Sequence, residues 1–110
     1  MRLKLTDYAE VGKFITEFKS LDNIGVLTHT FKNGYCYWFA HILHTRFPKS
    51  EIVYYSAGLH FACKIGNRVF DITGDITEQN LFFESWDMFK KVEPEESERI
   101  TKLCILKTGI

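Results

Sequence analysis

The sequence predicts one α+β domain over residues 1–110, with an antiparallel sheet of three to five strands packed against a helix that carries Cys36. The chain of 110 residues is long enough for one hydrophobic core and too short for two. Hydrophobic residues make up 45% of it, which excludes disorder as the main state. A helical segment followed by three strand-like segments between residues 34 and 73 gives the fold class.

Two helices are expected before the strands. Apolar residues at helical spacing predict the first near residues 7–20: Tyr8, Val11, Phe14, Ile15 and Phe18. Residues 20–33 hold several turn residues and are expected to form a loop with at most a brief strand. The second helix, at about 34–46, ends before Pro48, because the residue before a proline disfavours helical backbone. Its apolar face includes Cys36 in the first turn.

Three strands are expected at residues 51–56, 59–65 and 68–73. Gly66 and Asn67 between the last two are a two-residue hairpin signal. Residues 81–89 are amphipathic and fit either a helix or a strand. Pro94 and the two glutamates after it are typical of the first turn of a terminal helix.

The hairpin turn sets which residues share a face of the sheet. If Ile65 and Arg68 close the turn, Ala62 lies opposite Asp71, and His60 is a diagonal neighbour of Asp71 on the same face. Diagonal Cβ atoms are about 7 to 8 Å apart, a distance that an imidazole and a carboxylate can bridge with a hydrogen bond. The sequence therefore predicts a His60–Asp71 pair.

Cys36, His60 and Asp71 supply the three groups that thiol catalysis needs. A thiol nucleophile needs a base to accept its proton, and that base needs an acceptor that fixes its tautomer and orientation. A helix N-terminus also favours the thiolate. Each residue has a structural alternative: Cys36 as a buried core thiol, His60 as a hydrogen-bonded strand histidine, and Asp71 as a turn cap or partner of Lys64.

Composition narrows the function classes further. Fourteen basic and fourteen acidic residues give a net charge of zero, which makes a nucleic-acid binder an unfavoured class. No apolar run approaches 18 residues, so we expect no membrane-spanning segment. We expect a cytoplasmic location. Three cysteines without a CxxC pair favour reduced thiols over disulfides or zinc. Neither a metal nor a cofactor is expected.

The motifs NGYCYWFAHIL with Cys36, LHFACKIG with His60 and NRVFDITGD with Asp71 resemble, in order and element type, the papain-like superfamily. The resemblance is to its compact bacterial and transglutaminase-like forms, and also to a group of small bacterial and phage proteins. It implies a papain-like domain in which Cys36 attacks an amide of a protein or peptide substrate, His60 moves protons and Asp71 orients His60. The expected activity is that of a peptidase, deamidase or transglutaminase-like acyltransferase.

The sequence departs from the papain pattern at the oxyanion hole. The family places a glutamine shortly before the cysteine, whereas the one glutamine here is Gln79. Asn33, His29 or the hydroxyl of Tyr35 are the candidate donors instead, and Trp38 is a candidate wall of the acyl-binding cleft. The alternative function is an inactive small binding protein, phage-encoded and acting on a host protein, in which the cysteine, histidine and aspartate are relics.

Overall fold

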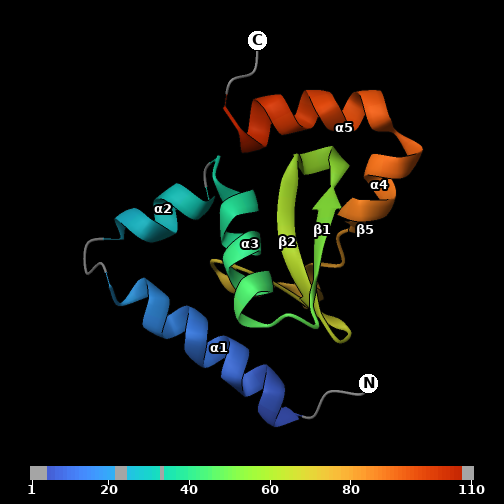
Figure 1. Cartoon of the computed structure of the whole chain (residues 1–110). Coiled ribbons are helices and arrows are strands. Elements are labelled where there is room, and N and C mark those ends of the chain that lie inside the picture. Colours follow the sequence, from blue (N-terminus) through green and yellow to red (C-terminus); the bar gives the residue numbers. More distant parts are fainter. Residues whose placement is uncertain (1–4, 22–24, 33, 108–110) are drawn as a thin grey trace.

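The computed structural model describes residues 5–21, 25–32 and 34–107. It is α+β, with a five-stranded antiparallel sheet in the order β4-β3-β2-β1-β5 (Figure 1). The strands are β1 (Glu51–Tyr55), β2 (His60–Ile65), β3 (Arg68–Asp71), β4 (Gly74–Asp75) and β5 (Glu84–Ser85). The helices are α1 (Leu5–Lys19), α2 (Val26–Lys32), α3 (Cys36–Arg46), α4 (Trp86–Val92) and α5 (Pro94–Ile100), followed by a π-helical turn, Thr101–Ile105.

Helix α2 corrects the expectation of a loop over residues 20–33. It is only seven residues long and buries none of them fully, so its sequence carries little helical periodicity. Tertiary contacts hold it: the ring of Phe31 lies 5.7 Å from that of Phe18 on α1 and 5.6 Å from that of Phe39 on α3. Such packing decides the conformation of a short segment whose local signal is weak.

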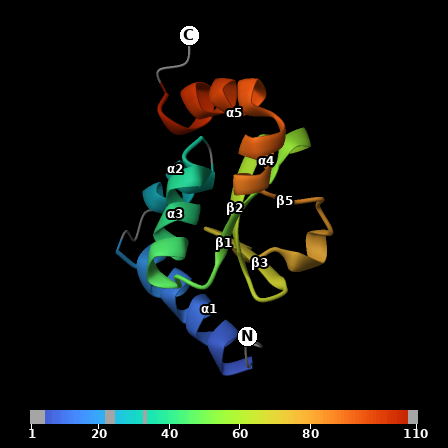
Figure 2. The same cartoon turned by 45° about the vertical axis from the view of Figure 1, so that its right-hand side comes forward.

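Helix α3 covers one face of the sheet, called here the inner face, and lies alongside β2 in both views (Figures 1 and 2). From β2 this face receives the buried side chains Phe61, Cys63 and Ile65, and α1 closes the core from the same side. The opposite face, called here the outer face, carries a smaller hydrophobic cluster. This cluster consists of Val53, Ala62 and Ile76, with Val69 and Phe83 packed against them.

The β2–β3 hairpin has the predicted register. Cys63 pairs with Phe70 and Ile65 with Arg68, and Gly66 in the turn takes the positive φ of 64° that glycine tolerates. The alternation of side chains then places His60 and Asp71 on the outer face together. This part of the sequence analysis is confirmed.

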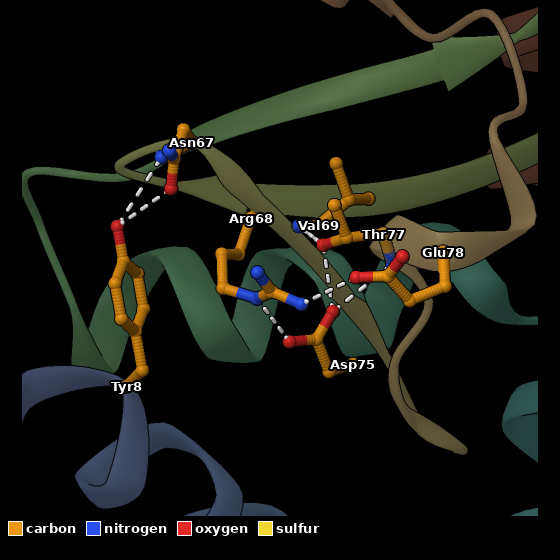
Figure 3. A network of polar contacts seen from close by, with 7 residues as sticks. All are labelled: Tyr8, Asn67, Arg68, Val69, Asp75, Thr77 and Glu78. Carbon is orange, nitrogen blue, oxygen red and sulfur yellow. Dashed lines mark hydrogen bonds and ion pairs between the residues drawn. The ribbon is translucent and has the colours of Figure 1, made fainter. Parts of the chain in front are cut away.

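Polar contacts fix both ends of β3 (Figure 3). The hydroxyl of Tyr8 on α1 donates to Asn67 Oδ1 at 2.9 Å, which ties the hairpin turn to the first helix. Arg68 pairs with Asp75 at 2.5 Å, and the backbone N–H of Thr77 donates to the same carboxylate at 3.0 Å. The hairpin and the segment that returns along its edge therefore form one unit, which positions Asp71.

The elements after residue 80 can now be compared with those that the sequence predicts. The stretch predicted as helix or strand at 81–89 is both, since β5 is followed directly by α4. Helix α5 begins at Pro94, as predicted, and lies above the starts of α3 and β2 (Figures 1 and 2). None of the helices in the described ranges is long and apolar enough to cross a membrane.

Candidate functional site

Cys36 is the first residue of α3 and lies where the helix meets the sheet. Gly34 has a φ of 106°, a conformation open to glycine, and it turns the chain into the helix two residues later. The side chain is 9% exposed and packs with Ala40, Phe61 and Trp86. The thiol is thus nearly buried at a helix N-terminus.

His60 is the first residue of β2, at the end of the sheet that faces the start of α3. The chain reaches it through Leu59, whose φ of 49° is left-handed and rare for leucine, directly after a single 3₁₀ turn. Its side chain is 22% exposed, and Nε2 lies 2.9 Å from Oδ2 of Asp71. The expected diagonal contact across the hairpin is therefore formed.

Asp71 is held by more than His60. Its other carboxylate oxygen, Oδ1, accepts the backbone N–H of Thr73 at 2.8 Å and the Thr73 hydroxyl at 2.5 Å. The carboxylate is therefore fixed in orientation, with Oδ2 directed at the imidazole. Asp75, the other acid near this turn, binds Arg68 and Thr77 instead.

The thiol of Cys36 hydrogen-bonds with the imidazole of His60. Because Nε2 of His60 faces Asp71, Nδ1 is the ring nitrogen left for the sulfur. The backbone N–H of Phe61, the residue after His60, donates to Sγ at 3.4 Å, and the backbone N–H of Tyr37 donates to it as well. The sulfur therefore sits among three groups that favour its negative charge.

The pKa values follow from these contacts. Burial acts to raise the pKa of Cys36, but the hydrogen bond with His60 and that from Phe61 outweigh it, so the pKa is lowered from 9.0. Burial acts to lower the pKa of His60, but the hydrogen bonds to Asp71 and Cys36 raise it from 6.5 to about 9. These shifts favour a thiolate and an imidazolium near neutral pH.

Asp71 completes the electrostatics of the site. Burial acts to raise its pKa, but the hydrogen bonds to His60 and Thr73 dominate and lower it from 3.8. The carboxylate is therefore ionised at neutral pH and faces a protonated imidazole. No group of three His, Cys, Asp or Glu side chains suited to a metal ion occurs among the described residues.

The structure places three of the four residues proposed as oxyanion donors or cleft walls in different surroundings. Asn33 lies outside the described residues. His29 is on α2 and is exposed. Tyr35 immediately precedes Cys36 and is 43% exposed, with the ammonium of Lys107 4.9 Å from its ring centre. Trp38 lies on α3, and its indole N–H donates to the carbonyl of Ile105 at 2.9 Å, so this donor is already used within the protein.

Sequence reasoning missed four contributors to the site. The N–H groups of Tyr37 and Phe61 and the ring of Phe83, 6.1 Å from that of His60, depend on tertiary packing and leave no local signal. Thr73 could have been found, because an aspartate two residues before a threonine is typical of a side-chain-stabilised turn.

The fold and the site define a small α+β protein with a cysteine, histidine and aspartate joined by hydrogen bonds at one end of its sheet. A family model described as Phage YunG-like protein matches residues 12–103. The chain therefore belongs to the Phage YunG-like family, and the matched region includes Cys36, His60 and Asp71. No curated protein and no solved structure matches the chain.

Proposed function

We propose that the protein is a cysteine-dependent amide hydrolase or acyltransferase with a papain-like core. Cys36 is the nucleophile, His60 the general base and acid, and Asp71 the residue that orients His60. The observation that carries the proposal is the two-sided bonding of His60, whose ring contacts Asp71 at 2.9 Å and also hydrogen-bonds with the Cys36 thiol. The order of helix-borne cysteine, strand-borne histidine and acid on the next strand supports the papain-like assignment.

The chemistry uses only these side chains and the substrate. The Sγ thiolate attacks the carbonyl carbon of an amide, and a C–S bond forms as the carbonyl π electrons move to oxygen. When the C–N bond breaks, the leaving nitrogen takes a proton from the His60 imidazolium. Neutral His60 then accepts a proton from water or an amine, which attacks the thioester carbon and displaces Sγ. Hydrolysis and transfer share this thioester and differ in the second nucleophile.

The start of α3 supports the developing charge on the carbonyl oxygen. Backbone N–H groups in the first turn of a helix lack partners within the helix, and the helix dipole adds a partial positive charge there. Helix α3 has eleven residues, enough for this effect, and Cys36 is its first. The backbone N–H of Tyr37 is taken by the sulfur, so the N–H of Cys36, on the residue of the nucleophile itself, is the donor we assign to the oxyanion.

The test is the rate of iodoacetamide alkylation of Cys36 as a function of pH, resolved by mass spectrometry, in the wild type and in His60→Ala. The wild type should keep a constant rate well below the free-thiol pKa of about 8.5. In His60→Ala the rate at pH 6.5 should fall about hundredfold, because only about 1% of an ordinary thiol is ionised there. Peptide mapping keeps Cys63 and Cys104 separate from Cys36.

An ordinary titration of Cys36 that His60→Ala leaves unchanged contradicts the proposal. That result would favour the second candidate, a binding protein that acts on a host protein without catalysis. If the ion-paired thiol is found, amide substrates of proteins and peptides become the compounds to screen.

A further inference from the structure

The outer face of the sheet carries a hollow of about 360 Å³, and one residue of its lining, Phe83, has its ring beside that of His60. Six residues of its lining matter here: Lys64, Asn67, Val69, Asn80, Phe82 and Phe83. Lys64 and Val69 occupy the same face of the β2–β3 hairpin as His60 and Asp71, by the alternation of the strands. Asn67 and Val69 are seen on this hairpin in Figure 3. The hollow and the candidate site thus share one surface of the sheet.

Phe83 connects the two. Its ring lines the hollow and also lies 6.1 Å from the ring of His60 and 5.7 Å from that of Tyr55. A chain that leaves the Cys36–His60 pair along the outer face therefore meets Phe83 first and the hollow next. From His60 to Lys64 is four residues of strand, about 13 Å at 3.3 Å per residue. An extended peptide covers that length in about four residues.

The chemistry of the lining selects the occupant. Phe82 is 76% exposed, and with Phe83 it offers aromatic surface that water covers in the free protein. Lys64 is the charged residue of the lining, and it makes no ion pair with any residue of the described ranges. Glu51 lies opposite Lys64 on the same face, and the two form no ion pair within the described ranges. The side chain of Asn80 adds a donor and an acceptor suited to a peptide backbone, and Asn67, whose Oδ1 accepts from Tyr8, adds its amide N–H groups.

We propose that this hollow binds an extended peptide segment of the substrate, with an apolar side chain against Phe82 and Phe83 and a carboxylate on Lys64. The inference rests on the proposed function, because it names the substrate class for the same site. It makes the substrate a polypeptide with an apolar and an acidic residue about four positions from the attacked amide, and it excludes a free amino acid amide.

Binding is tested without the thiol, in Cys36→Ser, by fluorescence anisotropy. The probes are two fluorescein-labelled peptides, Gly-Phe-Gly-Asp-Gly-Gly and the same sequence with lysine in place of aspartate, because residues two apart share a face of an extended peptide. The aspartate peptide should bind at least tenfold more tightly. Lys64→Glu should reverse this preference, and Phe82→Ala should weaken both peptides severalfold. Lys91→Glu makes the same charge change at an exposed residue of α4 and should leave the preference unaltered. Equal affinities, no binding, or an unaltered preference in Lys64→Glu would overturn the proposal.

The link to Cys36 is tested in the wild type with chloroacetamide and with the aspartate peptide carrying a chloroacetyl group at its N-terminus or a chloromethyl ketone at its C-terminus. In each, Sγ attacks the CH₂ carbon, the C–S bond forms, the C–Cl bond breaks and chloride leaves. One peptide reagent should alkylate Cys36 at least tenfold faster than chloroacetamide, and Lys64→Glu should abolish the advantage. No advantage in either direction contradicts the inference. A normal thiol titration with chloroacetamide contradicts the proposed function instead, so the two failures are distinguishable.

Discussion

Cys36 and Cys63 are both buried thiols, yet their surroundings give them opposite chemistry. Cys63 is 0% exposed in the middle of β2, and burial raises its pKa to about 11 even though Ser50 and the backbone of Glu51 hydrogen-bond with it. Cys36 is 9% exposed, and there the contribution of burial is outweighed by His60 and backbone N–H groups, which lower its pKa. Burial alone makes a thiol inert, and an imidazole beside it reverses the effect.

Position in the fold explains why only one of the two has such a partner. Cys63 points to the inner face of the sheet, among the apolar side chains of α1 and α3, and its hydrogen bonds are with Ser50 and the backbone of Glu51, neither of which brings a positive charge to the sulfur. Cys36 stands at a helix end, where backbone N–H groups are available and where β2 begins with His60. Chain ends of secondary structure elements supply polar groups that their middles do not.

The largest expected effect is the difference in reactivity between these two thiols in one molecule. At pH 7 a thiol of pKa about 11 is ionised to roughly 1 part in 10⁴, whereas the pKa of Cys36 is shifted in the opposite direction, below 9.0, by His60 and the backbone N–H groups. Cys36 should be alkylated by iodoacetamide about 10³-fold faster than Cys63 in the native protein, after allowance for the lower nucleophilicity of a low-pKa thiolate. Site-resolved mass spectrometry measures both rates in the same sample, and comparable rates would contradict the comparison. Labelling in urea provides the control, because the two thiols should then react alike.

A smaller effect is expected from Asp71→Asn. The variant removes a carboxylate that raises the pKa of His60, so the imidazolium beside Cys36 loses support. A change of one pKa unit corresponds to a tenfold change in ionisation, and we expect about a tenfold slower alkylation of Cys36 at pH 6. The pH profile of alkylation measures this shift.

Asp75→Asn is the matched control for Asp71→Asn. It removes the same charge four residues away, but Asp75 pairs with Arg68 and not with His60. Its alkylation profile should overlay that of the wild type. If both variants shift the profile equally, the effect is one of net charge and the specific role of Asp71 is wrong.

The contributions of His60 and Cys36 to the free energy of unfolding depend on pH in opposite directions. The raised pKa of His60, about 9 against 6.5, gives stability that is complete below pH 6.5 and is lost as the pH rises to 9. The lowered pKa of Cys36 gives stability that is complete above its ordinary value of 9.0 and is lost as the pH falls. The two trends oppose each other between pH 6.5 and 9, so the free energy of unfolding of the wild type should be nearly constant there.

Cys36→Ser keeps only the contribution of His60. Its free energy of unfolding should therefore fall as the pH rises above 6.5, because folded His60, still paired with Asp71, keeps a proton that unfolded His60 releases. Urea unfolding at several pH values, followed by tryptophan fluorescence, measures this slope. A slope equal to that of the wild type would mean that the thiol and the imidazole do not titrate as a pair.

The smallest effect is expected from Trp38→Phe. The C-terminal turn packs against the cluster that contains Cys36, and the indole N–H of Trp38 donates to the carbonyl of Ile105 at 2.9 Å. The variant keeps an aromatic ring and loses this donor, so stability should fall by about 1 kcal/mol. Urea unfolding measures the loss, and Phe82→Ala, at an exposed ring, should leave the midpoint unchanged.

How far the sequence predicted this molecule depended on the range of the interactions involved. The hairpin register was predicted because a two-residue turn at Gly66 and Asn67 fixes it locally, and the His60–Asp71 contact followed from it. Helix α2 was not predicted, because its conformation depends on contacts of Phe31 with aromatic rings on two other helices. Whether an element was predicted correctly depended on the strength of its local sequence signal and not on whether it is a regular helix or strand.

The candidate site divides in the same way. Its three side chains were identifiable because thiol, imidazole and carboxylate have distinct chemistry and fall on elements that the sequence predicts. The N–H group of Phe61 could not be identified from the sequence, since a backbone donor is present at nearly every residue. The ring of Phe83 could not be identified either, because Phe83 lies outside any regular element. Only the assembled fold brings them to Cys36 and His60.

The central claim, that Cys36 and His60 form an ion pair, is tested most directly by an NMR titration of the His60 imidazole. The wild type should show His60 protonated at pH 7 with a pKa of about 9, and Cys36→Ser should show a lower pKa because the thiolate no longer supports the imidazolium. His29, His41 and His44 serve as reference signals in the same spectra. A His60 that titrates near 6.5 and is unaffected by Cys36→Ser would contradict the ion pair and the proposed function with it.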